Sequence, residues 1–347
     1  MKNNNTTYII FGASGDLAKR YLLPAIKNLQ NNNYLGAVVP ISRKDYENLK
    51  DLIPENGDLP AGKAGKIFHL AIPPEAVANA VQIISNNFGR EKIKIILEKP
   101  FGVNLQSAQS LIEHIDKYFS EDQIYRVDHY LAKRSMQNLV TEKFDRSGIE
   151  KIEIIASEKI DIEGRVNFYE HTGALKDFVQ SHLLEMAAVL LSGSFETTQR
   201  HQALRNLKIV CDLKKHECVK RGQYEGYREE VGNAKSLTET FVSINVVSVD
   251  PAWRGVPIVL TTGKAFAEKF TEIRIKYKNG AKKIFKIEHE PDTYERVIKA
   301  AIEGRHDLFI SSGEILESWR ILDAVQQTWK KSKDLVIYKK GISIEEI

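Results

Sequence analysis

The most constraining feature of this chain is a short apolar run that leads directly into a glycine-bearing turn and then a helix-like segment. Residues 7–11 read TYIIF, the turn reads GASGDLAKR, and the YLLPAIKNLQ that follows it has apolar residues at helical spacing. Glycine lets the backbone approach a phosphate closely, and the N–H groups at a helix start attract anions. Strand, glycine turn and helix together predict a dinucleotide-binding unit, with a simple tight turn as the alternative.

The turn also supplies candidate cofactor ligands, which are Gly12, Ser14, Gly15, Asp16 and Leu17. The next apolar run, GAVVPIS, ends beside Arg43 and Lys44, where an NAD enzyme usually carries an acid for the ribose hydroxyl. A guanidinium suits the 2′-phosphate of NADP instead. Arg43 therefore favours NADP over NAD, and the alternative interpretation of this stretch is a solvated loop.

The remaining pattern divides the chain into two predicted domains. Apolar runs at 67–74 and 93–97 alternate with helix-like segments at 75–88 and 104–118, which predicts a parallel, doubly wound sheet. After about residue 150, stretches such as IEKIEIIASEKI and TEIRIKYKN alternate with period two, interrupted by helix-like residues 173–192 and a Ser-capped helix near the C-terminus. We expect an α/β Rossmann-type dinucleotide-binding domain, 1–127, and a β+α domain with a large, mostly antiparallel sheet, 128–347.

Composition excludes several classes of protein. The 347 residues include 50 basic and 46 acidic side chains, and a formal charge of +4 is too small to suggest a nucleic-acid partner. Cys211 and Cys218, with His216 between them, lack a second pair of zinc ligands, so no metal is predicted and a reducing cytoplasm is favoured. We find no apolar run of membrane-spanning length and no signal-peptide core, so no membrane partner is expected.

Two further stretches concentrate chemistry. YRVDHYLAKR, residues 125–134, holds Asp128, His129, Tyr130 and Lys133, and KDFVQSHLLEM, residues 176–186, places His182 in an apolar segment. If residues 128–133 form a helical turn, His129 and Lys133 share one face and Asp128 points about 100° away. The alternatives are a solvated polar face for the first stretch and a structural core histidine for the second.

These motifs occur in a recognisable order. FGASGDLAKR, FHLAIPP, EKPFGVNLQSAQ, QIYRVDHYLAKRSMQNL, EGRVNFYEHTGALKDFVQSHLLEM, WRGVPIVLTTGKAF and PDTYERVI follow one another along nearly the whole chain, which resembles the glucose-6-phosphate dehydrogenase family. The resemblance implies NADP-linked oxidation of the C1 hydroxyl of a hexose 6-phosphate to the lactone, a reaction of the pentose phosphate pathway. The glucose–fructose oxidoreductase family also carries EKP, but it does not explain RVDHYLAK followed by DFVQSHLLE.

The resemblance assigns roles to particular residues. His182 matches the general base, Asp128 the carboxylate that orients it, and Lys99 a lysine between nicotinamide and substrate. The phosphate ligands match His129, Tyr130 and Lys133, with Lys264 as a further sugar-phosphate ligand. Glu158 and Asp177 match carboxylates that hold sugar hydroxyls. The Lys99–Pro100 bond is a candidate for the cis form.

The sequence also departs from the family pattern. It is shorter, with gaps between Arg43 and IFHLAIPP and between TEIRIKYKNG and PDTYERV, so no structural NADP is expected. Unusual residues stand at Tyr21, Ala132, Arg134, Ser181 and Thr261. Three interpretations follow: a compact glucose-6-phosphate dehydrogenase, the same chemistry on another sugar phosphate or an amino sugar, or a non-catalytic binding descendant. The large sheet predicts a homodimer or homotetramer.

Overall fold

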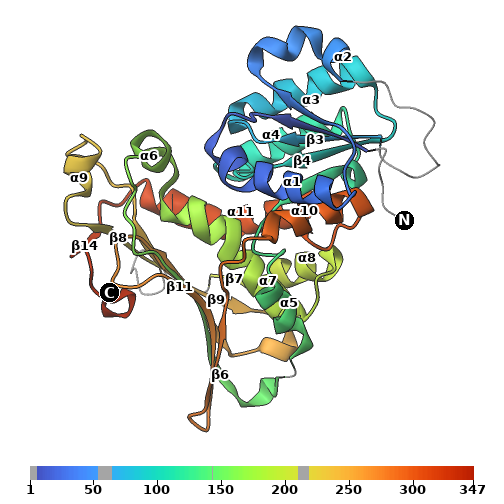
Figure 1. Ribbon diagram of the computed structural model, residues 1–347. Helices are drawn as coiled ribbons and strands as arrows, with labels where there is room; N and C mark the ends of the chain where they lie inside the picture. The colour runs from blue at the N-terminus through green and yellow to red at the C-terminus, as the bar shows by residue number, and fades with distance from the viewer. Residues whose placement is uncertain (1–5, 54–64, 143, 210–218) are drawn as a thin grey trace. The chain divides into compact units, whose positions relative to one another are not determined.

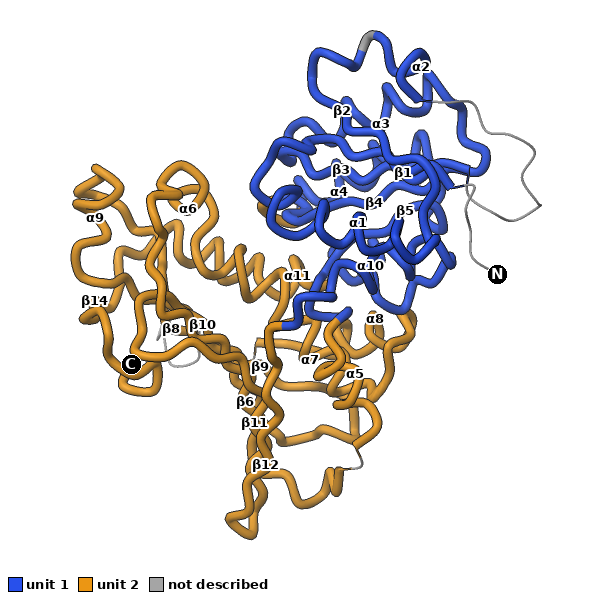
Figure 2. The backbone as a smooth tube through the Cα atoms, in the orientation of Figure 1, with its two compact units in different colours: residues 1–102, 106–132, 290–315 blue, residues 103–105, 133–289, 316–347 orange. Residues whose placement is uncertain are grey.

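The computed structural model describes residues 6–53, 65–142, 144–209 and 219–347, and the chain forms two compact units (Figures 1 and 2). The first unit comprises residues 1–102, 106–132 and 290–315, and the second comprises 103–105, 133–289 and 316–347. The sequence-based boundary at 127/128 lies close to the transition at 132/133. The structure adds a segment to the first unit, 290–315, that returns from far along the chain. Cys211, His216 and Cys218 lie outside the described residues.

A parallel sheet forms the centre of the first unit. Its described strands run in the order β13-β5-β4-β3-β1-β2, and only β13 pairs antiparallel to its neighbour. All residues of β1 and β3 are buried, as expected for strands covered on both faces. The strands are β1 (Thr7–Phe11), β2 (Val38–Ile41), β3 (Lys66–Leu70), β4 (Ile93–Leu97), β5 (Ile124–Val127) and β13 (Phe309–Ile310).

Helices cover both faces of this sheet, with α1 and α10 on one face and α3 and α4 on the other (Figure 1). Helix α3 shows why: Val77, Ala80, Val81 and Ile84 follow helical spacing and are all buried. The helical elements are η1 (Ala18–Leu22, π-helical), α1 (Leu23–Asn31), η2 (Arg43–Asn48), α2 (Leu49–Leu52), α3 (Pro74–Phe88), α4 (Leu105–Asp116), η3 (Glu121–Gln123) and α10 (Thr293–Glu303). The predicted doubly wound α/β architecture is confirmed.

The second unit is built on a mostly antiparallel sheet. Its path through the described strands is β12-β11-β6-β10-β9-β8-β14, with β7 on β9, and only the β10–β6 and β14–β8 pairs are parallel. Alternate residues of β9 are fully buried, so one face of that strand packs on the core. The strands are β6 (Ile149–Ser157), β7 (Leu207–Lys208), β8 (Val219–Tyr224), β9 (Phe241–Ser248), β10 (Pro257–Gly263), β11 (Phe270–Tyr277), β12 (Lys282–Lys286) and β14 (Val336–Tyr338). This confirms the predicted sheet.

A long interrupted helix packs on this sheet. Its middle part, η5 (Leu175–Leu183), is π-helical and contacts β6, β9 and β10. The other helical elements described in this part of the chain are α5 (Arg134–Thr141), η4 (Arg146–Gly148), α6 (Val166–Ala174), α7 (Leu184–Ser192), α8 (Thr197–Arg205), α9 (Tyr227–Glu230), η7 (Pro251–Trp253), α11 (Ser312–Trp329) and η8 (Ile344–Glu346). The predicted serine cap of the C-terminal helix is present, since Ser311 Oγ contacts Glu314 Oε2 at 2.7 Å and accepts from Glu314 N at 3.3 Å.

Within the described ranges, no single helix has both the length and the apolar composition needed to cross a bilayer. One pair bent by 104°, Val166–Ser192 with Thr197–Arg205, meets the length and composition criteria when taken together.

Candidate functional site

The glycine turn after β1 can be built only with glycine at its first position. Gly12 has φ +82°, and a Cβ atom there would lie 2.1 Å from the carbonyl oxygen of Ala71, which follows β3. Gly12 N also donates to Ile41 O, at the end of β2, over 3.1 Å. The turn therefore lies at the end of β1, between the neighbouring strands β2 and β3, where the strand order of the sheet reverses. This is the usual ligand position in an open α/β sheet.

The rest of the turn leads into the helix with its polar atoms accessible. Gly15 N donates to Gly12 O at 2.9 Å, and Lys19 N donates to Gly15 O at 3.1 Å, which starts the helical path toward η1. Ser14, Gly15 and Asp16 are exposed, and Leu17 is half-buried. A glycine that admits close backbone approach, followed by a helix start, suits the pyrophosphate of a dinucleotide.

Arg43 stands at the start of η2, just after β2. The adjacent acid is already engaged, because Asp45 accepts hydrogen bonds from Ser42 N at 2.7 Å and Ser42 Oγ at 2.6 Å. The Ser42 side-chain hydrogen bond is the main reason that the pKa of Asp45 is lowered, with Lys44 a minor contributor. Arg43 and Lys44 are both exposed, and neither forms an ion pair with a described residue. Both cations are available to an anionic ligand.

A series of hydrogen-bonded, largely buried side chains includes Glu98, the residue immediately before Lys99. Tyr8 OH contacts His69 Nδ1 at 2.5 Å, and His69 Nε2 contacts Glu98 Oε1 at 2.7 Å. Glu98 Oε2 also accepts from Tyr294 OH at 3.3 Å. Since the carboxylate can only accept, the Nε2–H tautomer of His69 satisfies every member of this chain. It fixes the residue next to Lys99, whose bond to Pro100 is cis, as expected.

Residues 129–132 form turns and no residue of 128–133 is helical, so the predicted helical turn in this stretch is wrong. Tyr130 N donates to Asp128 Oδ1 at 2.9 Å, and Leu131 N donates to Asp128 O at 3.1 Å. An aspartate carboxylate that captures the N–H two residues later competes with a helix. Helix α5 begins only at Arg134, and the shared face proposed for His129 and Lys133 does not exist as an α-helical face.

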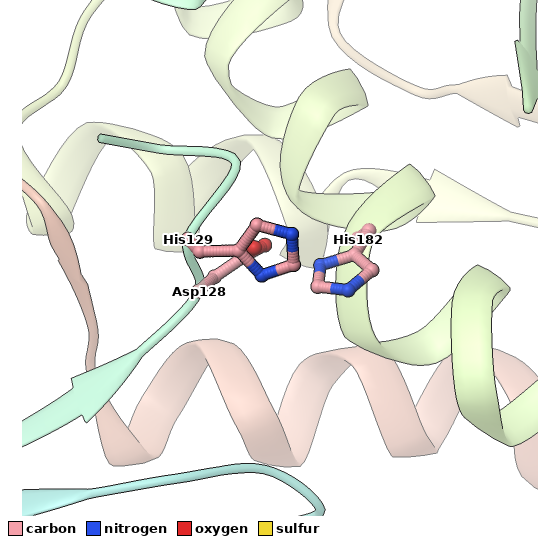
Figure 3. Close-up of side chains that lie close together, drawn as sticks. All are labelled: Asp128, His129 and His182. Atoms are coloured by element: carbon pink, nitrogen blue, oxygen red, sulfur yellow. The ribbon is translucent and has the colours of Figure 1, made fainter. Parts of the chain in front are cut away.

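The three residues of this turn have different surroundings. The Asp128 side chain is buried, and Tyr130 is 7% exposed. The His129 ring lies 4.8 Å from the ring of Tyr130 and is stacked 6.5 Å from that of Tyr294. Figure 3 draws Asp128 and His129 on the segment that follows β5, together with His182, which projects from a helix.

His182 lies in the π-helical part of the second unit. Its side chain is 1% exposed, and the Phe178 ring meets it edge to face at 5.1 Å. Ser181 Oγ donates to Lys176 O, five residues back, at 2.9 Å, and Gln180 Nε2 donates to Ser318 Oγ of α11 at 2.9 Å. π-Helical turns are rare and often occur at functional positions. The same element also carries Asp177, which is half-buried.

Glu158 and Lys264 form an ion pair directly beyond the ends of two parallel strands. The register of β6 and β10 pairs Ser157 with Gly263, so the residues that follow each strand become neighbours. The Lys264 side chain is 3% exposed, and that of Glu158 is 21% exposed. The Lys264 ammonium also lies 5.4 Å from the ring centroid of Tyr169. Two residues predicted from widely separated motifs thus meet.

The remaining predicted residues are placed by local structure. Lys133 is 6% exposed and immediately precedes α5, and its carbonyl accepts from Met136 N at 3.1 Å. Among the unusual positions, Thr261 Oγ1 is bonded to Ser243 Oγ at 3.0 Å, and Tyr21 packs 5.9 Å from the ring of Tyr294. Ala132 is buried, whereas Arg134 is exposed.

Several residues of these clusters could not be predicted from the sequence. Tyr8, His69 and Glu98 were not predicted, although Glu98 stands inside the EKP motif. Tyr169 and Glu239 were also missed, since Tyr169 is buried near Lys264 and Glu239 is buried where it accepts a hydrogen bond from Leu175 N, which only the folded chain reveals.

Comparison with known proteins now gives this geometry a context. The family model of the glucose-6-phosphate dehydrogenase NAD binding domain matches residues 9–44 and 38–138. The family model of the glucose-6-phosphate dehydrogenase C-terminal domain matches residues 131–291 and 285–344. The glucose-6-phosphate 1-dehydrogenase of Buchnera aphidicola subsp. Acyrthosiphon pisum is 29% identical, over 96% of this chain and 93% of the relative. That alignment spans 457 positions, so more than a hundred of them are residues of the relative opposite gaps in this chain.

Two further likenesses agree. The glucose-6-phosphate 1-dehydrogenase of Borreliella burgdorferi is 30% identical over 81% of this chain and 73% of its own length. A solved structure described as glucose-6-phosphate dehydrogenase in complex with its substrate glucose-6-phosphate has a TM-score of 0.84 and 23% identity, and the match covers 98% of this chain and 95% of that one. The structural likeness establishes the shared fold.

Proposed function

The chain belongs to the glucose-6-phosphate dehydrogenase family, and from this we propose that His182 is the general base of the reaction and that Asp128 orients it. The protein is an NADP-dependent oxidoreductase that oxidises the C1 hydroxyl of glucose 6-phosphate to 6-phosphogluconolactone. The observation that carries this conclusion is that both family domains match, in order, over nearly all of residues 9–344.

The proposed base chemistry uses ordinary properties of imidazole and carboxylate. One ring nitrogen of His182 accepts the proton of the C1 hydroxyl, because imidazole is a base of suitable strength near neutral pH. The Asp128 carboxylate holds the other nitrogen in its N–H form and stabilises the imidazolium that results. The burial of both side chains supports this assignment, since a protein interior strengthens the interaction between opposite charges.

The first unit fits the cofactor. Gly12 lets the turn pass close to the Ala71 backbone, where a Cβ would not fit, and it is followed by Ser14, Gly15 and Asp16, which are exposed, and by Leu17, which is half-buried; we assign these residues to the dinucleotide. We assign Arg43 to the 2′-phosphate and Lys99 to the region between the nicotinamide and the substrate. NADP⁺ supplies a hydride acceptor for C1 when it is bound. We assign cofactor binding to residues 1–127, and substrate binding and self-association to 128–347.

The substrate ligands divide by charge. His129, Tyr130 and Lys133 are assigned to the 6-phosphate, for which a cation and two donors are suited. Lys264 is assigned to the sugar phosphate, and Glu158 and Asp177 are assigned to the sugar hydroxyls. The Glu158–Lys264 ion pair supports this assignment, because it holds both side chains in place within a largely buried region.

A second candidate is the same chemistry on another sugar phosphate or on an amino sugar. It is favoured by Thr261, whose hydroxyl bonds to Ser243 at a position where the family pattern has a cation, and by the gaps against the Buchnera relative. The third candidate is a non-catalytic binding descendant, which has no need of His182 with Asp128.

One assay separates the three. Purified protein is mixed with NADP⁺ or NAD⁺ and with glucose 6-phosphate, glucosamine 6-phosphate, galactose 6-phosphate or glucose, and reduced nicotinamide is followed by absorbance. We expect turnover with NADP⁺ and glucose 6-phosphate and little with glucose. Turnover with only another sugar phosphate would select the second candidate. Silence with every pair, in a folded protein that binds NADP⁺, would select the third.

Metal ions are tested in the same assay. Asp128, His129 and His182 offer one carboxylate and two imidazoles, donor types that some metal ions accept (Figure 3). The proposed mechanism uses them without a metal, so dialysis against EDTA is expected to leave the rate unchanged. A rate that falls with EDTA and returns with added Zn²⁺ would contradict the proposed roles of these residues.

Two properties extend the proposal. We propose that the protein works in the cytoplasm and that it is a homodimer or homotetramer that associates through the sheet of the second unit, where Ile284 is 51% exposed and Ile337 is 50% exposed. Sedimentation equilibrium gives the oligomeric state directly, and a monomer at micromolar concentration would contradict the association.

A further inference from the structure

Glu239, two residues before β9, is a buried acid that the proposed mechanism does not use. Its side chain is 8% exposed. The residue that follows it is fixed to the sheet, because Thr240 N donates to Gly222 O at 2.8 Å and Thr240 O accepts from Lys264 N at 2.9 Å. Glu239 therefore belongs to a segment that is bonded directly to the backbone of a residue assigned to the sugar phosphate.

Glu239 bonds to the start of η5. Gly173 interrupts the helical backbone between α6 and η5, with φ +66° and ψ 171°. Beyond this break, Ala174 N donates to Glu239 O at 2.9 Å, and Leu175 N donates to Glu239 Oε1 at 3.0 Å. The first N–H groups of a helix have no acceptor within the helix, so a residue 64 positions away does here what a neighbouring cap usually does.

The carboxyl group of Glu239 fits closely against the break between the helices. A Cβ atom on Gly173 would lie 2.4 Å from Glu239 Oε1, so glycine leaves the room that the carboxyl group occupies. The residue before Glu239 bonds to the other helix, since Thr238 Oγ1 donates to Glu170 O of α6 at 3.0 Å. Two consecutive residues thus hold the two helices separately, Thr238 for α6 and Glu239 for η5.

Asp177 lies in the first turn of η5, close to the end that Glu239 holds. His182 comes later in the same element, where a second bond holds the helix, because Gln180 Nε2 donates to Ser318 Oγ of α11 at 2.9 Å. Loosening the start of η5 should therefore displace Asp177 more than it displaces His182.

We propose that Glu239 is a positioning residue, which fixes the start of η5 and thereby the place of Asp177 among the sugar ligands. The inference rests on the proposed function, because it takes Asp177 as a ligand of the sugar hydroxyls. Glu239 acts as a hydrogen-bond acceptor for Leu175 N, so the side-chain oxygen of glutamine can replace it. A ligand that is already held in place binds more tightly, because less ordering is needed when the substrate arrives.

The test compares substitutions that keep or remove the acceptor. Glu239→Gln keeps a side-chain oxygen, whereas Glu239→Met has a similar length and none. We expect Glu239→Met to raise the KM for glucose 6-phosphate about tenfold, with kcat changed less than about threefold and NADP⁺ affinity unchanged. Glu239→Gln should keep both kinetic constants of the wild type. If Glu239→Met does not fold, Glu239→Asp replaces it, because a side chain shorter by one methylene does not reach Leu175 N and should raise KM in the same way.

Thr238→Val is the matched control. It removes the neighbouring hydrogen bond, which goes to α6 and not to η5, so it should lower Tm and leave KM unchanged. A double-mutant cycle then tests whether Glu239 acts through Asp177. In an Asp177→Asn background, Glu239→Met should lower kcat/KM by less than about twofold, because the ligand that it displaces is already lost.

Several results would overturn the inference. These are an unchanged KM in Glu239→Met, a rise in KM of equal size in Glu239→Gln or in Thr238→Val, and losses of kcat/KM that multiply in the double variant. Failure of both Glu239→Met and Glu239→Asp to fold would also overturn it, because it would show a role in folding alone. A wild type without activity on glucose 6-phosphate is a different result, because it refutes the proposed function itself.

Discussion

The candidate sites of the two units are built by different physical means. In the first, the candidate cofactor site is made of backbone: a turn whose Gly12 lies against Ala71 and which we propose binds the dinucleotide. In the second, the candidate substrate site consists of side chains held by one another, as in the ion pair of Glu158 with Lys264. A site made of backbone atoms tolerates many different side chains, but it does not tolerate an added Cβ atom where the turn lies closest to the neighbouring backbone. A side-chain site tolerates small shifts of the backbone but no loss of a charged partner.

The largest effect is expected at His182. A substitution at this candidate site in the second unit should abolish the reaction and leave cofactor binding by the first unit intact. His182→Asn should lower kcat about a thousandfold, because proton removal from C1 loses its base. The NADP⁺ affinity of the first unit should not change. The measurement is initial-rate kinetics with NADP⁺ binding by calorimetry. His171→Asn is the control, since His171 is exposed and its ring contacts the carbonyl oxygen of Asn167, and it should keep its rate. A His182→Asn variant with a tenth of wild-type activity would disprove the assignment.

Gly12→Ala tests the backbone site and should weaken NADP⁺ binding about a hundredfold, since the new Cβ would force the turn away from Ala71 O. Gly89→Ala is matched to it, because Gly89 also has positive φ but nothing within 4 Å of the added Cβ. That control should cost stability without changing affinity. Equal NADP⁺ affinity in the two variants would mean that the turn does not contact the cofactor.

Arg43→Ala should produce a smaller, selective effect. Removing the guanidinium is expected to weaken NADP⁺ about tenfold and to leave NAD⁺ almost unchanged, because only NADP⁺ carries the 2′-phosphate. Lys50→Ala removes an exposed cation from α2 of the same unit and serves as the control. Should both cofactors lose affinity equally, Arg43 has no role in discrimination.

The smallest effect concerns the pH dependence of the second unit. Burial raises the pKa of Glu239, so the folded state holds this proton to higher pH than the unfolded state does. The free energy of unfolding therefore falls as pH rises from the ordinary glutamate pKa through the raised value. Glu239→Gln should remove that fall, by a few degrees in Tm at most, while the amide oxygen can still accept from Leu175 N. Parallel Tm curves for variant and wild type from acid to neutral pH would contradict this.

Local signals predicted the strand, turn and helix that form the first candidate site. The strand at 7–11, the glycine turn and the following helix are contiguous in sequence, and the structure reproduces each of them. Likewise the period-two stretches after residue 150 became antiparallel strands. Strand β13, by contrast, has two residues, and no pattern could assign it to the first sheet beside β5.

The side-chain site was predicted through family resemblance and less through local pattern. The sequence could not reveal that the Asp128 carboxylate would bond Tyr130 N and replace a helix with turns. Nor could helical spacing distinguish the π-helical 175–183 from an α-helix, since both bury a similar stripe. The position of Tyr169 beneath Lys264 depends on contacts across 95 residues of chain, which only the fold can supply.

The discontinuity of the first unit has a consequence for the order in which the chain is synthesised (Figure 2). A ribosome delivers β1 to β5 early, but α10 and β13 follow only after most of the second unit. Until then the β5 edge lacks its last strand, and Lys94 lacks the carbonyls of Ala301 and Ile302, to which it donates at 2.6 and 3.1 Å. Nascent chains that end before residue 290 should therefore hold an incomplete first unit. The second unit can form its sheet from β6 to β12 before the first unit is complete.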